Sequence, residues 1–276
     1  MRKILFMVCF CSLFMSCDDV EKKGNERLGM AQYAFKKGDY NEAKLQIDSI
    51  KILYPKAFKA RKEGIKLLQQ VELKEQEKSL VYLDSILQQK KKEFEQISKS
   101  FAFEKNAEYQ SLGNYFYPTQ TVERNLHRSF LRFQVSEKGI MSMTSIYCGG
   151  RNIHHVAIKV TTTDGSFAQT PSSKDIYETS NLGEKVEKAD YKKGEDGGVI
   201  DFIYLNKEKS ILIDFIGDRK YSIKMQSEDI HALINIYELA QNLSAILKIE
   251  KETDEAHLKI KFINKKIEFD KSKSKQ

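Results

Sequence analysis

The sequence predicts an α+β protein, with a helical N-terminal region followed by an antiparallel β-sheet domain that carries one major helix. Three observations lead to this prediction. Through about residue 100 the chain is rich in Lys, Glu, Gln, Leu and Ala and has one proline, Pro55. From about Arg128 apolar and polar residues alternate in short runs, which is typical of half-buried strands. After Ser227 the apolar spacing becomes helical again.

The chain opens with a segment that is typical of an export signal. Arg2 and Lys3 precede an apolar stretch over residues 4–15, and charged residues follow from Asp18. The stretch is too short to span a bilayer, because a spanning helix needs about 20 apolar residues. We therefore expect a signal peptide that is removed from the mature chain.

The composition of the remaining residues divides the mature chain into five parts. They are a tether over 17–24, a helical region over 25–100, a junction over 101–127, an α+β domain over 128–270 and a basic tail over 271–276.

Residues 13–17 read Leu-Phe-Met-Ser-Cys and resemble the lipobox of bacterial lipoproteins. The resemblance implies cleavage before Cys17, attachment of diacylglycerol to its thiol, and anchoring in a lipid bilayer of the cell envelope. We expect the outer membrane, on either face, rather than the inner one. An ordinary signal peptide with an incidental cysteine is the alternative.

Charge and cysteine content restrict the remaining possibilities. Once Arg2 and Lys3 leave with the leader, 44 basic and 39 acidic residues remain, which gives a net charge of +5. This charge is compatible with anionic lipid, lipopolysaccharide or acidic glycan nearby, although solubility alone accounts for it, and nucleic acid is not an expected partner of an exported protein. Cys9 and Cys11 leave with the leader, so lipidation of Cys17 leaves Cys148 as the single thiol. We therefore expect a fold held by its core, without disulfides.

The first helical elements are predicted between residues 25 and 54. Two helical patterns are separated by Lys37-Gly38-Asp39-Tyr40, with Ala31 before this turn and Ala43 and Pro55 after it. These residues resemble a tetratricopeptide repeat, which implies a helical hairpin. A degraded second copy follows, because residues 83–86 repeat the pattern of residues 47–50. Two or fewer repeats cannot form a solenoid groove, so we expect a spacer or a docking surface for a protein partner.

One long helix is predicted from about Ala57 to Ser100, because no Gly or Pro interrupts residues 65–112. Its apolar residues follow a heptad pattern that Gln76 and Lys90 interrupt. The residues of this seam are Leu73, Leu80, Leu83, Leu87, Phe94, Ile97 and Phe101. Pairing with a second chain and burial within the same chain are both open, and so is the oligomeric state.

The strand-rich half is predicted to begin with a hairpin, residues 130–135 and 140–147, around a turn that ends at Gly139. Further strands are expected at 153–160, 199–205, 211–216 and 221–225. Ser227 is a suitable cap for a helix of five to six turns that reaches about Leu247. A final hairpin is expected over 258–269, around Asn264 and Lys265.

One cluster suggests chemistry. Cys148 is followed by Gly149, Gly150 and Arg151, and then by His154 and His155. A thiol with a nearby cation and two imidazoles suggests a cysteine nucleophile with a histidine base. A strand over 153–160 would nevertheless place the two histidines on opposite faces, and a lone cysteine is usually a small buried hydrophobe. We therefore favour a structural Cys148, and we expect neither a metal nor a cofactor.

Two further features are assigned to structure. Tyr109, Tyr115, Phe116 and Tyr117 form an aromatic cluster at the junction, for which packing is favoured over stacking on sugar or peptide. Residues 194–198, Gly-Glu-Asp-Gly-Gly, are predicted to be a loop, since they lack the ligand alternation of a calcium site.

These expectations favour a lipid-anchored envelope protein that acts in binding or scaffolding and is not an enzyme. One alternative is an envelope hydrolase or transferase that uses Cys148 with His154 or His155. Another is an accessory subunit of an export or surface assembly complex.

Overall fold

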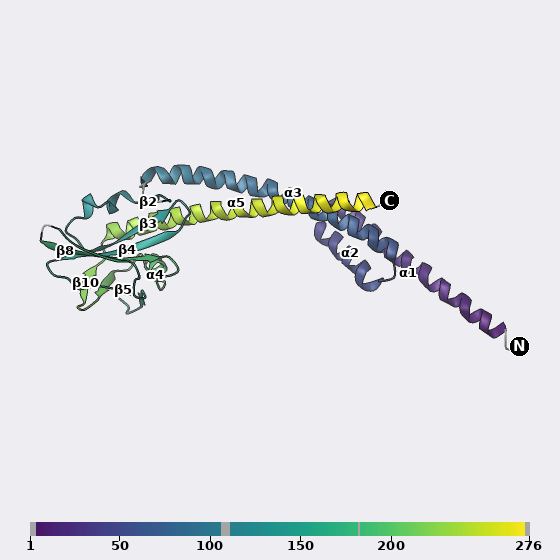
Figure 1. Ribbon diagram of the computed structural model, residues 1–276, viewed down its shortest axis with the longest axis horizontal. Helices are drawn as coiled ribbons and strands as arrows, with labels where there is room; N and C mark the ends of the chain where they lie inside the picture. The colour runs from purple at the N-terminus through teal and green to yellow at the C-terminus, as the bar shows by residue number, and fades with distance from the viewer. Residues whose placement is uncertain (1–3, 106–110, 182, 274–276) are drawn as a thin grey trace. The chain divides into compact units, whose positions relative to one another are not determined.

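The computed structural model describes residues 4–105, 111–181 and 183–273, with side chains described from residue 19 onward except at 181. It confirms the α+β class, with long helices and two antiparallel sheets (Figure 1). The chain divides into two compact units. Residues 1–86 and 251–276 form the helical unit, and residues 87–250 form the sheet unit.

The helical unit begins with the predicted hairpin, α1 (Ile4–Lys37) and α2 (Tyr40–Leu53). Gly38 joins the two helices with a φ of +77°, a value that favours glycine. Asp39 then caps α2, because its side chain accepts a hydrogen bond from the backbone N–H of Glu42 at 3.0 Å. Gly38 and Asp39 thus form the turn that the sequence predicted between the two helices.

Small residues allow the helices of this unit to pack closely. Ala31, Ala43, Ala57 and Ala60 are fully buried, and a methyl group added at Gly24 would lie only 2.7 Å from the Cβ of Ala57. The first turns of α3 (Phe58–Ile97) therefore pack directly on the hairpin. The rest of this core consists of Leu28, Ala34, Ile47, Ile50, Leu67 and Val71.

Polar contacts join α3 to α5 (Ser227–Lys273) within each of the two units. In the helical unit, Gln69 donates to the carboxylate of Asp270 at 2.8 Å. In the sheet unit, Lys91 pairs with Glu250 at 2.8 Å. Asn242 also donates to the carboxylate of Glu93 at 3.2 Å, so the parts of α3 and α5 within the sheet unit run antiparallel.

The prediction for the end of the chain is wrong. α5 continues to Lys273, so the helix does not end near Leu247, and residues 258–269 form no hairpin. Residues 258–262 read Leu-Lys-Ile-Lys-Phe, which imitates the twofold alternation of a strand. The helical spacing is set by buried Ala256 and Ile263 instead, and it leaves Leu258 and Phe262 66% and 69% exposed.

The sheet unit contains two antiparallel sheets, each described in its spatial order. The larger sheet consists of β1 (Ala102–Glu104), β2 (Asn114–Phe116), β3 (Phe130–Ser136), β4 (Met141–Gly149), β8 (Glu184–Lys192) and β7 (Ile176–Asn181). The smaller one consists of β10 (Tyr221–Lys224), β9 (Ile211–Ile216), β5 (Ala157–Thr162) and β6 (Phe167–Gln169). Single turns of 3₁₀-helix lie at Ser98–Ser100, Pro118–Gln120 and Glu123–Asn125. The hairpin β3–β4 and the strands β9 and β10 confirm the predictions for those segments.

Both sheets contribute to one apolar core, which also contains α4 (Val199–Leu205) and the first turns of α5. The prediction of a strand at 199–205 is therefore wrong, because these residues form a helix. Seven residues, six of them apolar, are too few to reveal a period, and in the helix the buried carboxylate of Asp196 accepts a hydrogen bond from the backbone N–H of Ile200 at 2.7 Å. Residues 194–198 form the expected loop, which places the side chain of Asp196 against the first turn of α4.

The aromatic residues of the junction pack within the sheet unit, apart from Tyr109, which lies outside the described residues. The ring of Tyr115 lies 5.9 Å from that of Phe94. Phe116 is buried under the guanidinium of Arg132, which lies 3.9 Å from its ring centre. Tyr117 contacts Phe101 and His231 edge to face. These contacts support the packing role.

Candidate functional site

Cys148 lies near the end of β4 and is partly buried. Its thiol donates a hydrogen bond to the carboxylate of Glu184 at 3.4 Å, and Glu184 also pairs with Nδ1 of His127. Burial raises the pKa of the Cys148 thiol, and the hydrogen bond to Glu184 raises the pKa further. The surroundings therefore favour the neutral thiol, whereas a nucleophilic cysteine needs a stabilised thiolate.

His155 lies in the loop between β4 and β5, where it joins two partners from the larger sheet. Its Nε2 lies 2.8 Å from the hydroxyl of Ser145, and its Nδ1 lies 3.0 Å from the carboxylate of Glu187. A hydroxyl, an imidazole and a carboxylate in this order are the parts of a catalytic triad. Ser145 and Glu187 project from β4 and β8 into the same core.

Burial argues against catalysis by these three residues. Ser145, His155 and Glu187 each have 0% of their surface exposed, so no substrate carbonyl can reach the hydroxyl of Ser145 in this conformation. The imidazole also packs edge to face on Phe215 of the smaller sheet, with ring centres 5.2 Å apart. The three residues thus form a buried polar network that ties the loop to both sheets.

Glu187 is the centre of this network because it accepts four hydrogen bonds. One carboxylate oxygen accepts from the backbone N–H groups of Ile153 and His154, at 2.7 and 3.0 Å. The other accepts from the backbone N–H and from Nδ1 of His155, at 2.8 and 3.0 Å. One side chain on β8 therefore fixes three successive backbone groups of the loop.

The charges of the buried pair follow from these contacts. Burial would raise the pKa of Glu187, but the backbone hydrogen bonds outweigh it and hold the pKa below its ordinary value. Burial lowers the pKa of His155, and its bond to Glu187 only partly offsets this effect. At neutral pH the pair is therefore an ionised carboxylate with a neutral imidazole.

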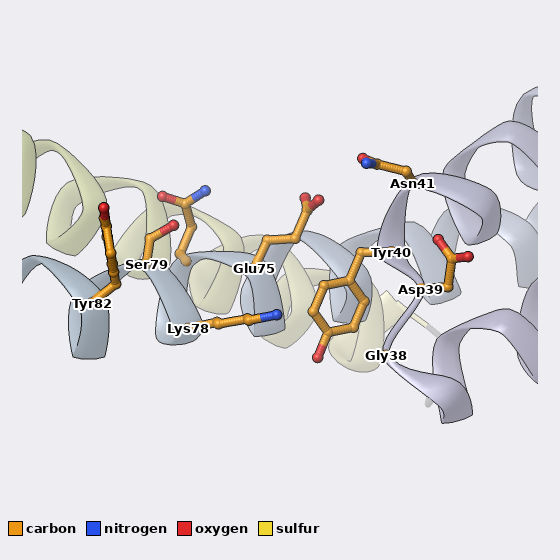
Figure 2. A pocket seen from close by; sticks show the side chains of 9 residues that line it. Gly38, Asp39, Tyr40, Asn41, Glu75, Lys78, Ser79 and Tyr82 are labelled. Atoms are coloured by element: carbon orange, nitrogen blue, oxygen red, sulfur yellow. The ribbon is translucent and has the colours of Figure 1, made fainter.

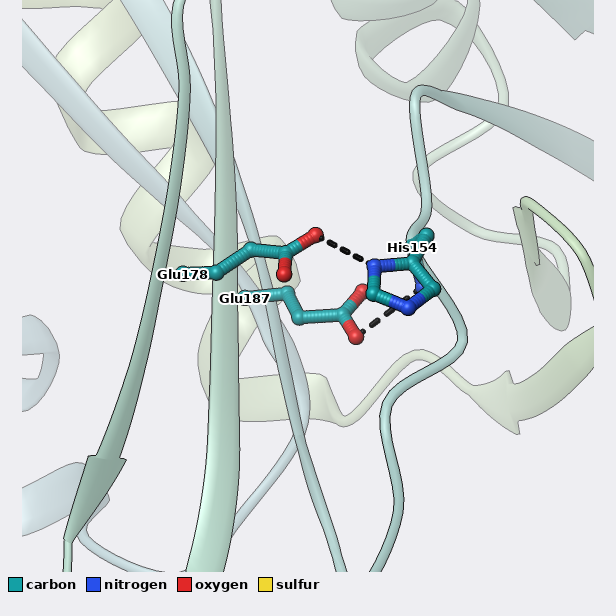
Figure 3. A group of neighbouring side chains, drawn as sticks. All are labelled: His154, Glu178 and Glu187. Carbon is teal, nitrogen blue, oxygen red and sulfur yellow. Dashed lines mark hydrogen bonds and ion pairs between the residues drawn. The ribbon is translucent and has the colours of Figure 1, made fainter.

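His154 points away from this core, toward Glu178 of β7 (Figure 3). Its φ of +50° is unusual for a residue other than glycine and turns the exposed imidazole outward. Nδ1 lies 2.9 Å from the carboxylate of Glu178, which raises the pKa of His154. The histidines thus point in different directions, as expected, but a loop conformation and not a strand over 153–160 separates them.

His154, Glu178 and Glu187 bring three potential metal-ligand atoms within 4.8 Å of one another. Glu187 has little capacity left for a cation, because its four acceptor positions are used by four N–H groups. Glu178 also accepts from the side chain of Asn152 at 3.0 Å. The donor set therefore suits the folding of the loop better than it suits a metal ion.

The structure does not bring the predicted catalytic residues together. Each of the three forms hydrogen bonds with different partners. Cys148 contacts Glu184, His154 contacts Glu178, and His155 contacts Ser145 and Glu187. Glu187, which lies 32 residues from His155 in the sequence, was not predicted as a partner of the histidines. One signal was available, since Glu187 shares its side of β8 with buried Ala189 and Tyr191. A glutamate on the apolar side of a strand indicates a buried polar partner.

The helical unit has a surface hollow of about 570 Å³ between the α1–α2 turn and α3 (Figure 2). Tyr40 and Tyr82 contribute rings to it, and Glu75 on its floor is held by Lys44 at 2.7 Å. Tyr82 is 65% exposed and its neighbour Val81 is 74% exposed. The residues that line the hollow are Gly38, Asp39, Tyr40, Asn41, Glu75, Gln76, Lys78, Ser79 and Tyr82. Exposed aromatic residues beside a rigid turn are typical of protein-binding surfaces.

The sheet unit has a larger groove of about 880 Å³. Its floor is the outer side of the larger sheet, where Asn114, Gln134 and Ser142 present uncharged polar groups. Loop residues Pro171 and Lys174 form part of its wall. The groove is an accessible surface, in contrast to the closed network around His155.

The lipidation candidate Cys17 lies among the residues whose side chains the structure does not describe. Within the described residues, none of the helices combines the length and the apolar character that a bilayer-spanning segment requires. A scan of family models and searches of curated proteins and solved structures gave no match to this chain.

Proposed function

We propose that this protein is a lipid-anchored scaffold of the bacterial cell envelope that binds a protein partner through its helical unit. Diacylglycerol on Cys17 attaches it to the membrane, with the outer membrane favoured. The hollow between the α1–α2 turn and α3 receives the partner.

The exposed apolar surface beside this hollow is the observation that carries the proposal. Val81 and Tyr82 are 74% and 65% exposed on α3, although the opposite side of the same helix is buried against the chain's own residues. A helix with one buried side normally carries polar residues on the other. Large exposed apolar side chains beside a hollow are characteristic of interaction sites.

The competing enzymatic function receives little support from the geometry. The thiol of Cys148 has a raised pKa and donates to a carboxylate. His155 is fully buried and already has two hydrogen-bond partners. A role as subunit of an export or surface assembly complex remains within the proposal, since it differs only in the identity of the partner.

A site-specific crosslinking experiment tests the partner proposal. A photoreactive amino acid replaces Tyr82 in the full chain expressed in its own cell envelope, and the matched control carries it at Leu205, which is 79% exposed on the sheet unit. We expect one defined crosslinked protein from position 82 and none from position 205. Equal crosslinking patterns from both positions would contradict a docking surface on α3.

Membrane fractionation tests the anchor and the enzymatic alternative together. We expect Cys17→Ala to release the protein from the membrane fraction, and Cys148→Ala to leave both its location and its cellular role unchanged. A folded Cys148→Ala protein that stays anchored but loses its cellular role would favour the enzyme.

A further inference from the structure

The connection between α2 and α3 forms an apolar, basic corner on the helical unit. Residues 51–59 read Lys-Ile-Leu-Tyr-Pro-Lys-Ala-Phe-Lys and contain no acidic residue. Ile52, Leu53 and Phe58 are 72%, 56% and 71% exposed. The lysines of this segment, Lys51, Lys56 and Lys59, are exposed as well. We call residues 51–59 the α2–α3 corner.

The corner has a fixed shape. Arg61 donates a hydrogen bond to the carbonyl of Pro55 at 2.7 Å, and Ala57 is fully buried in the core of the helical unit. The backbone is thus held from inside while the large apolar side chains point outward. Because these side chains are presented by an ordered turn, little conformational entropy is lost when a surface covers them.

The corner lies beside residues 21–24 of α1. The carboxylate of Glu21 accepts a hydrogen bond from the backbone N–H of Ala60 at 2.8 Å, and Gly24 lies against Ala57 and Ala60. Glu21 follows Cys17 by four residues, which span at most about 14 Å in any conformation. A lipid on Cys17 would therefore hold the bilayer surface close to the α2–α3 corner.

The chemistry of the corner suits a bilayer surface that contains anionic lipid. Aromatic and aliphatic side chains enter the boundary between headgroups and acyl chains, and lysines beside them attract anionic headgroups. Val81 provides a contrast, because it is equally exposed on α3 but lies about 35 Å from Phe58 along the helix. Exposure alone does not distinguish these two positions, whereas proximity to Cys17 and local positive charge do.

We propose that the α2–α3 corner inserts Ile52, Leu53 and Phe58 into the membrane interface as a second attachment point beside the lipid on Cys17. This inference rests on the proposed lipid anchor and deepens it. A single lipid would leave the helical unit free to turn on the membrane, whereas two adjacent attachments fix its orientation.

Fluorescence quenching tests this contact. The chain contains no tryptophan, so Phe58→Trp provides a single probe in the corner, and Val81→Trp provides a matched probe away from it. Each full chain is expressed with its leader, purified from membranes in detergent and reconstituted into phosphatidylglycerol–phosphatidylcholine vesicles that contain brominated phosphatidylcholine. Mass spectrometry of the same preparation reports whether Cys17 is acylated.

We expect the tryptophan of Phe58→Trp to shift its emission to the blue and to lose most of its intensity to bromine placed high on the acyl chain. The tryptophan of Val81→Trp should keep the emission it has in vesicles without bromine. Adding Lys51→Gln, Lys56→Gln and Lys59→Gln to Phe58→Trp should reduce the quenching. Vesicles of phosphatidylcholine alone should reduce it in the same way.

The outcomes separate the two proposals. An acylated chain whose Phe58→Trp probe is unquenched overturns the membrane contact and leaves a protein as the occupant of the corner. An unmodified Cys17 overturns the anchor. In that case the same vesicles are mixed with the unanchored chain, and quenching of the Phe58→Trp probe still decides whether the corner binds a bilayer.

Discussion

Replacing Glu187 with alanine is the sharpest test of the network in the sheet unit. The substitution removes the acceptor of three backbone N–H groups and of Nδ1 of His155, all of them buried. Leaving a buried donor without a partner costs about 1–3 kcal/mol. Because four donors lose their acceptor at once, and relaxation of the loop recovers part of the cost, we expect Glu187→Ala to lower the free energy of unfolding of the sheet unit by about 3–5 kcal/mol.

A loss of this size is a large part of the stability of a domain, which is about 5–15 kcal/mol in total. Urea unfolding of the chain from Asp18 onward, followed by circular dichroism, measures it. Hydrogen exchange of peptides from β4 and β8 assigns the loss to the sheet unit. Glu178→Ala is the matched control, because Glu178 lies opposite Glu187 on β7 but is exposed, and we expect it to cost less than about 1 kcal/mol. Equal losses for the two variants would show that the buried contacts of Glu187 do not stabilise the sheet unit.

Three further predictions concern acid, packing and reactivity. Burial lowers the pKa of His155 in the folded chain below its ordinary value of 6.5, so the unfolded chain binds a proton at higher pH than the folded chain does. The free energy of unfolding of the sheet unit should therefore decrease as the pH falls below about 6.5 in urea titrations. His155→Gln should lessen this decrease. Gly24→Ala should destabilise the helical unit by about 1–3 kcal/mol in thermal unfolding, since its new methyl group would meet Ala57 at 2.7 Å. Gly29→Ala, on the same helix with open space around it, should stabilise it by about 1 kcal/mol, and the reverse order would contradict the packing described for α1. Cys148 should react with iodoacetamide more slowly than free cysteine near neutral pH, and a faster reaction would revive the nucleophile hypothesis.

Local signals in the sequence predicted the elements whose ends they mark. The Gly38-Asp39 turn predicted the α1–α2 hairpin, and Gly139, with a φ of +70°, predicted the β3–β4 hairpin. The absence of Gly and Pro predicted α3 to within a few residues. In each case one residue type has a direct conformational effect on its own neighbourhood.

Contacts between distant segments decided what the sequence could not predict. The alternation over residues 258–262 resembles a strand, but the segment is helical and its buried residues are Ala256 and Ile263, which lie outside the alternating run. β8 was missed because it consists mostly of charged and polar residues, and pairing with β4 and β7 is what makes it a strand. The Cys148 and histidine cluster was visible as a set of residue types, whereas the partners that determine its chemistry, Glu184 and Glu187, come from this unpredicted strand.

The proposed role as a lipid-anchored scaffold depends most directly on whether Cys17 is acylated. Mass spectrometry of the N-terminal peptide of the mature chain measures that state. We predict a mature chain that begins at Cys17 and carries diacylglycerol on its thiol, and a Cys17→Ala chain that leaves the membrane fraction. A mature chain with an unmodified Cys17, or membrane association that Cys17→Ala leaves unchanged, would contradict it.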